Sequence, residues 1–117
     1  MRYAAAVLTL FAAGPALAAS KVTLNFPGEG ATEIMPKISY KCDDGRNIEA
    51  TYINAPGNSL AVLVLDGSTV VTVSVLAASG VKYVAGKYVW WTKGPEADLY
   101  DVTNGENAPG THCAEAK

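Results

Sequence analysis

The chain has 117 residues, a length that suits a single domain. Its formal net charge is −2, and the sequence contains no cluster of lysine and arginine residues that would neutralise a phosphate backbone. Composition and charge therefore argue against a nucleic-acid-binding protein. The mild negative charge is compatible with a basic protein partner.

Residues 1–18 have the three parts of a secretory signal peptide. Arg2 supplies the positive start, residues 7–13 form a short apolar run, and Ala16-Leu17-Ala18 is a small-residue cleavage site. The run is too short for an uncleaved membrane span, and no cysteine follows it to carry a lipid. We expect cleavage after Ala18 or Ala19, no stable membrane anchor, and a mature chain in the periplasm or outside the cell.

Cys42 and Cys113 are the only two cysteines of the chain. An oxidising compartment would join them, and a small domain gains stability from such a crosslink. The alternative is a metal or redox pair, but the sequence has no Cys-x-x-Cys motif, and His112 is its single histidine. We predict a Cys42–Cys113 disulfide and no metal site.

Residues 19–36 are predicted to be an N-terminal extension, followed by one domain over residues 37–117. Within the extension, Val22–Phe26 alternates apolar and polar residues and predicts a short strand. The proline- and glycine-containing stretch Pro27–Pro36 is expected to be a loop of unassigned role.

From Lys37 onwards, alternating runs separated by turn residues predict β-strands. Asp66-Gly67 is the best hairpin signal, and Asp43–Arg46 predicts another tight turn. Residues 54–58 are expected to interrupt the strands completely, and Thr103–Gly110 to form a polar loop. The expected strands are Lys37–Cys42, Asn47–Ile53, Ser59–Leu65, Ser68–Leu76, Val81–Ala85, Lys87–Thr92, Ala97–Val102 and Thr111–Ala114.

This series of short strands in hairpin order predicts an all-β fold. A small, closed, antiparallel eight-stranded barrel leaves no sheet edge exposed, and a flattened sandwich is the alternative. A barrel of this size is filled by its own side chains, so we expect no large ligand cavity inside it.

The residues needed for catalysis are scarce. His112 is interpreted as an exposed residue near the chain end, and Ser79 does not lie in a Gly-x-Ser-x-Gly elbow. Glu96 and Asp98 would share one face of a strand, which we interpret as a solvated outer surface. The sequence also lacks metal-ligand spacing and a phosphate-binding loop. We therefore predict a protein that is not an enzyme and uses no cofactor.

Residues 78–99 contain both tryptophans of the chain. Aromatic residues beside glycine-containing loops are typical of interfaces, although they also fill barrel cores. Trp90 and Trp91 are adjacent in a predicted strand and so point to opposite faces, which allows one to be core while the other faces outwards. Lys93, in a Thr-Lys-Gly turn, is by itself most simply a solvated surface lysine.

Two overlapping motifs in this segment carry a resemblance. The first is Ser79-Gly80-Val81-Lys82-Tyr83, and the second places Gly86, Trp90, Trp91, Lys93 and Gly94 at fixed spacings after Tyr83. With these motifs the chain resembles the MliC/PliC family of bacterial c-type lysozyme inhibitors, with Trp90 where the family usually has phenylalanine. The resemblance runs from about Tyr40 to Leu99.

The resemblance implies an eight-stranded barrel that places its Ser79 and Lys93 loops in the active-site cleft of a c-type lysozyme. Lysozyme uses a protonated glutamic acid and an ionised aspartate, with which a serine hydroxyl and an ammonium group can pair. The alternative is a periplasmic, envelope-associated module that binds a sugar or a protein through the same aromatic face. The residues that the resemblance assigns to lysozyme binding are Ser79, Gly80, Tyr83, Trp91, Lys93 and Gly94.

Overall fold

The computed structural model describes Ala6, residues 21–28 and residues 30–117. The predicted signal peptide, residues 1–18, therefore lies outside the described residues apart from Ala6. Within the described part of the chain, no helix is long and apolar enough to cross a membrane.

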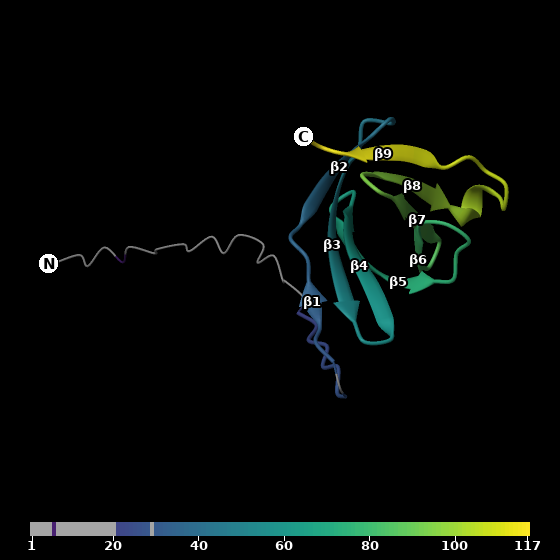
Figure 1. Ribbon diagram of the computed structural model, residues 1–117. Coiled ribbons are helices and arrows are strands. Elements are labelled where there is room, and N and C mark those ends of the chain that lie inside the picture. The colour runs from purple at the N-terminus through teal and green to yellow at the C-terminus, as the bar shows by residue number, and fades with distance from the viewer. Residues whose placement is uncertain (1–5, 7–20, 29) are drawn as a thin grey trace, which may run out of the picture.

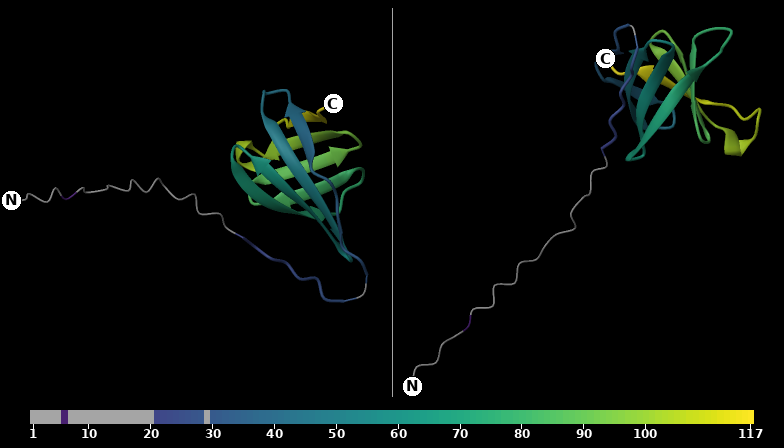
Figure 2. Two further views of the ribbon diagram at one scale, coloured as in Figure 1. Left: turned by 90° about the vertical axis from the view of Figure 1, so that its left-hand side faces the viewer. Right: turned by 90° about the horizontal axis from the view of Figure 1, so that it is seen from below.

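Eight strands, β2 to β9, form a closed antiparallel barrel (Figure 1). Each strand pairs with the next along the chain, and β9 returns to pair with β2. Figure 2 shows how the strands run obliquely around the barrel wall. The predicted fold class is confirmed. The strands are β1 (Glu33–Ile34), β2 (Ile38–Cys42), β3 (Asn47–Ala55), β4 (Asn58–Leu65), β5 (Ser68–Val75), β6 (Val81–Ala85), β7 (Tyr88–Lys93), β8 (Glu96–Asp101) and β9 (Thr111–Glu115).

The N-terminal extension differs from the sequence prediction. Val22–Phe26 is not a strand, and the short strand β1 lies instead inside the expected loop. β3 is longer than β2, and β1 pairs with the part of β3 that β2 does not reach, at Ile53 and Asn54. Pro36, which has no backbone N–H, lies between β1 and β2, where a continuous ladder would need a donor.

Most strands of the barrel also begin or end one or two residues away from the expected position, and two of these differences have a clear cause. The expected break at residues 54–58 is only two residues long: β3 extends to Ala55, β4 begins at Asn58, and the turn Pro56-Gly57 joins them. Gly57 has a φ of 75°, which a glycine adopts without steric cost. Val102 was expected to end β8 but begins a short 3₁₀ helix, η1 (Val102–Asn104).

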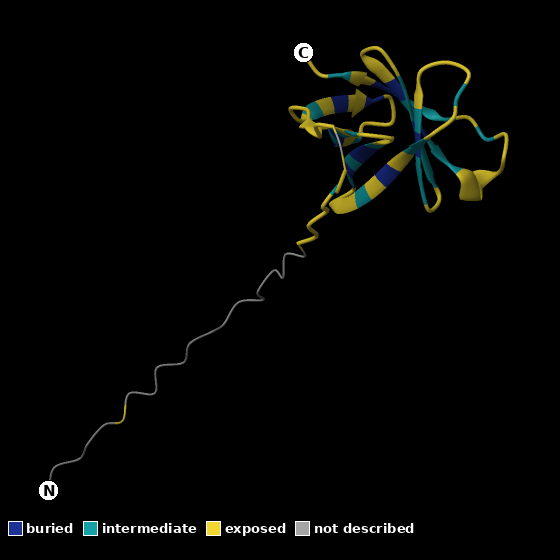
Figure 3. Cartoon of the chain, turned by 60° about the horizontal axis from the view of Figure 1, so that its bottom comes forward, coloured by how far each residue is buried: buried dark blue, intermediate teal, exposed yellow. Residues whose placement is uncertain are grey.

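Buried residues alternate with more exposed ones along the strands (Figure 3), and the buried side chains form the core of the barrel. Trp90 is fully buried, and its indole N–H donates to the Tyr52 hydroxyl at 2.9 Å. The Tyr52 hydroxyl also bonds the Tyr40 hydroxyl at 2.9 Å, and burial raises the pKa of Tyr40. The buried polar atoms at the centre therefore satisfy one another.

The seam where the barrel closes is covalently joined. Cys42 of β2 and Cys113 of β9 are direct cross-strand partners and form a disulfide, as the sequence predicts. Only three residue pairs connect β2 to β9, so this bond reinforces one of the shortest pairings in the barrel.

Candidate functional site

Two loops meet at one end of the barrel. The β5–β6 loop contains Ser79 and Gly80, and the β7–β8 turn contains Gly94 and follows Lys93. They lie together because β6 and β7 are paired along their length, with Val81 opposite Thr92. Ser79, Gly80, Lys93 and Gly94 are all exposed, so four of the six predicted contact residues form one accessible surface.

Trp91 connects these two loops. Its indole N–H donates to the Ser79 carbonyl oxygen at 2.8 Å, which fixes the β5–β6 loop to β7. The ammonium groups of Lys93 and Lys82 lie 5.3 Å and 5.2 Å from the centre of the Trp91 ring, within the range of a cation–π interaction. Trp91 is half-buried on the outer wall and Trp90 is inside, as predicted for adjacent strand residues.

Gly80 lets the two loops approach closely. It has a φ of +64°, and a Cβ atom placed there would lie 2.3 Å from the Thr92 carbonyl oxygen and 2.8 Å from Cγ of Lys93. The aliphatic part of Lys93 therefore lies directly against the Gly80 backbone. A larger residue at this position must displace the β5–β6 loop, because the Thr92 carbonyl oxygen belongs to the backbone of β7 and cannot rotate away as a side chain can.

Lys93 carries its charge on the exposed surface of this site. None of the salt bridges found among the described residues includes Lys93, although Glu96 is its cross-strand neighbour. Glu96 is directed instead to His112, with 3.6 Å between Oε1 and Nε2. The position of the Lys93 ammonium is therefore set by two contacts: its aliphatic chain packs against Gly80, and the ammonium group lies beside the Trp91 ring.

Tyr83 is placed differently from a contact residue. It is only 5% exposed and its ring lies against that of Tyr52, with 5.6 Å between centroids. Successive side chains of a strand point to opposite faces, so Tyr83 points inward where Lys82, before it in β6, faces outward. Its place in the motif is therefore explained by the core.

A cluster beside the site was missed in the sequence. His112 is half-exposed but not isolated: its Nδ1 lies 3.1 Å from Oδ1 of Asp98, its direct cross-strand neighbour. The hydrogen bond to Asp98, together with the charge of Glu96, raises the pKa of His112. Asp98 is in turn the neighbour of Trp91 on β7, so the cluster extends from the site along the outer wall.

This cluster predicts a pH dependence of stability. Because folding raises the pKa of His112, the stabilisation is fully present below the unfolded-state pKa of about 6.5 and is lost as the pH rises through the folded value. We expect the free energy of unfolding to fall with rising pH above about 6.5 in the wild type, and to fall less in His112→Asn. Urea unfolding at a series of pH values measures this free energy. If it changes equally with pH in the two proteins, the pH dependence does not come from His112.

The comparisons with known proteins agree with these features. The family model described as membrane-bound lysozyme-inhibitor of c-type lysozyme matches residues 40–108. The chain belongs to this family. A relative of that name from Pseudomonas aeruginosa is 47% identical over 94 residues, covering 79% of this chain and 73% of the relative. One from Cupriavidus necator is 43% identical over 81 residues, covering 68% of this chain and 65% of the relative.

Two solved structures of the family have the same fold. The Pseudomonas aeruginosa inhibitor MliC, in complex with hen egg white lysozyme, is 42% identical with a TM-score of 0.71, covering 84% of this chain and 98% of that one. PliC, the periplasmic inhibitor of c-type lysozyme from Salmonella typhimurium, is 27% identical with a TM-score of 0.58, covering 72% and 99%. The resemblance drawn from the two motifs is confirmed.

Proposed function

We propose that this protein inhibits c-type lysozyme by inserting its Ser79 and Lys93 loops into the active-site cleft of the enzyme. The observation that carries the proposal is that both motif loops project from one end of the barrel and are tied together through Trp91. The complex of the related MliC with hen egg white lysozyme supports the choice of partner. Inhibition of cell-wall lysis by purified protein tests it.

The chemistry of the cleft fits the two side chains. Lysozyme has one ionised and one protonated carboxyl group there, and the Lys93 ammonium would pair with the ionised one. The Ser79 hydroxyl would bond to the other acid. Such charge-assisted hydrogen bonds are stronger in a cleft closed to water than on an open surface. The inhibitor itself performs no reaction.

The barrel would also favour the encounter with lysozyme. Removal of the predicted signal peptide takes away Arg2 and no acidic residue, so the net charge of the mature chain would be close to −3. The net negative charge of the barrel attracts a basic enzyme. Lys93 places a positive charge beside the β7–β8 turn, at the end of the barrel that would enter the cleft. The hydrogen bond from Trp91 to the Ser79 carbonyl restrains the β5–β6 loop in the free protein, which reduces the conformational entropy lost on binding.

The close contact between Gly80 and Lys93 can be tested by comparing alanine substitutions at Gly80 and at Gly86. Gly80→Ala is expected to weaken lysozyme inhibition by at least tenfold, because the added methyl group displaces the β5–β6 loop from Lys93. Gly86→Ala, in the β6–β7 turn, introduces a side chain at a similar positive φ but meets no atom within 4 Å. Both carry a backbone cost of about 1–2 kcal/mol in stability. Inhibition constants measured for the two variants distinguish loop position from stability, and equal losses of inhibition would contradict the role of Gly80.

We further propose that the mature protein acts in the periplasm or outside the cell, after cleavage near Ala18. The names of the relatives, which include a periplasmic inhibitor, support an envelope location. The N-terminal sequence of protein purified from the periplasm would establish the cleavage site.

A further inference from the structure

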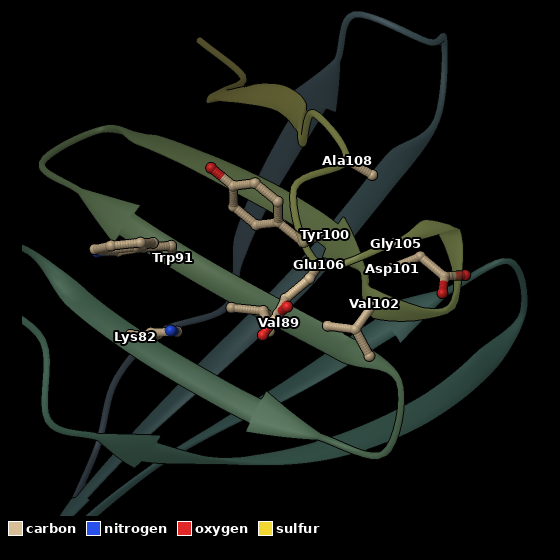
Figure 4. Close-up of a pocket in the computed structure, with 9 residues that line it drawn as sticks. All are labelled: Lys82, Val89, Trp91, Tyr100, Asp101, Val102, Gly105, Glu106 and Ala108. Carbon is tan, nitrogen blue, oxygen red and sulfur yellow. The ribbon is translucent and has the colours of Figure 1, made fainter.

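A hollow lies on the outer wall of the barrel, beside the loop site (Figure 4). Its volume is about 390 Å³, and it lies between β6, β7 and β8 on one side and the loop of residues 102–108 on the other. It includes neither Ser79 nor Lys93. The side chains that characterise it are Lys82, Val89, Trp91, Tyr100, Val102 and Glu106.

The wall formed by residues 102–108 makes several contacts where it leaves β8. The Val102 N–H donates to the Lys87 carbonyl oxygen at 2.8 Å, and the Thr103 N–H donates to Asp101 Oδ1 at 2.9 Å. The Lys87 ammonium lies 3.3 Å from the Asp101 carboxylate. The Thr103 hydroxyl also bonds Asp101, and these contacts lower the pKa of that carboxyl. The loop is therefore anchored at its start.

Tyr100 is fixed as well, by a close contact with Gly110. A Cβ atom at Gly110 would lie 2.7 Å from Cε1 of Tyr100, so the ring occupies the space that a side chain would need. Tyr100 and the start of the loop are therefore held in place before a ligand binds, which lowers the entropic cost of binding.

The lining combines two kinds of surface. Trp91 and Tyr100 supply aromatic rings, and Val89 with Val102 adds aliphatic surface. Figure 4 shows the Lys82 amine and the Glu106 carboxylate directed into the same space. A wholly apolar ligand would strip water from these two charged groups without replacing their hydrogen bonds. The hollow therefore suits a ligand with a flat apolar face and a polar edge.

We propose that this hollow binds a short saccharide, stacked on the Tyr100 ring beside Trp91 and hydrogen-bonded through its polar edge to Lys82 and Glu106. The C–H face of a pyranose ring is apolar and weakly positive, which matches the negative face of an aromatic ring. Its hydroxyl groups both donate and accept, so one ring can satisfy an ammonium and a carboxylate together. This activity is separate from lysozyme inhibition, although Trp91 borders both sites.

A titration of the protein alone with tri-N-acetylchitotriose tests the saccharide site. Trp90 is fully buried, so a change in tryptophan fluorescence reports on Trp91. We expect a saturable change, with binding about tenfold weaker in Tyr100→Ala. Glu106→Gln, on an exposed loop, should weaken binding several-fold without affecting the fold. Glu33→Gln, which alters an exposed carboxylate on β1, is the matched control and should bind like the wild type.

The absence of saturable binding at millimolar saccharide would overturn the proposal, as would equal binding by the wild type, Tyr100→Ala and Glu106→Gln. Since no lysozyme is present, this result does not depend on the inhibitory function. Lys93→Ala separates the two sites further: it should retain saccharide binding while losing inhibition.

Discussion

Replacing Lys93 with alanine is expected to raise the inhibition constant against c-type lysozyme by roughly thirtyfold to several thousandfold. The substitution would leave a lysozyme carboxylate without its partner in a cleft that the inhibitor has closed. Loss of one partner of a buried charge pair costs about 2–5 kcal/mol, which corresponds to that range. Ser79→Ala removes a hydrogen bond and should cost less, about 1–3 kcal/mol. Neither change should affect the fold, because Ser79 is exposed on the β5–β6 loop and Lys93 is exposed at the last position of β7, where a turn was expected.

Two other lysines provide the controls for this experiment. Lys82 also stacks on the Trp91 ring, and Lys87 pairs with Asp101 at the opposite end of the barrel. An exposed lysine that acts only through general attraction is worth less than about 1 kcal/mol. Lys82→Ala and Lys87→Ala should therefore inhibit nearly as well as the wild type, with circular dichroism confirming that each variant folds. If all three lysines cost the same small amount, diffuse charge attraction would replace insertion as the explanation.

Removal of the disulfide is expected to lower the free energy of unfolding by about 4 kcal/mol. Cys42 and Cys113 are 71 positions apart, so the bond restricts a large part of the unfolded chain. It also joins β2 to β9, whose pairing comprises three residue pairs. Urea unfolding of the wild type with and without reductant, beside the Cys42→Ser/Cys113→Ser double variant, measures the effect. An unchanged unfolding midpoint would contradict it, and two free thiols in periplasmic protein would show that the bond does not form there.

The hairpins of the barrel were predictable because their signals are local. Asp66-Gly67 joins β4 to β5 as expected, with Asp66 itself at a positive φ of 47°. The turn at Pro56-Gly57 was misjudged because the flanking Asn54 and Asn58, which are typical turn residues, belong to the strands. β1 was missed because a strand of two residues has no periodicity to detect.

The candidate site was only partly predictable for a different reason. The motifs located Ser79, Lys93 and Trp91, but the bond from Trp91 to the Ser79 carbonyl depends on how β6 and β7 are aligned. The contact of His112 with Asp98 similarly depends on the alignment of β8 and β9, which no short motif encodes. Contacts between strands follow from register, and register is set by the whole barrel.

The most direct measurement is the rate at which a c-type lysozyme, such as the hen egg white enzyme, clears a turbid cell-wall suspension in the presence of this protein. If the Ser79 and Lys93 loops occupy the cleft, an equimolar amount or a small excess should slow clearing strongly, and the protein alone should clear nothing. Goose-type or invertebrate-type lysozymes should be inhibited weakly or not at all. Clearing by c-type lysozyme at its full rate in a stoichiometric excess of the protein would contradict the proposed inhibition.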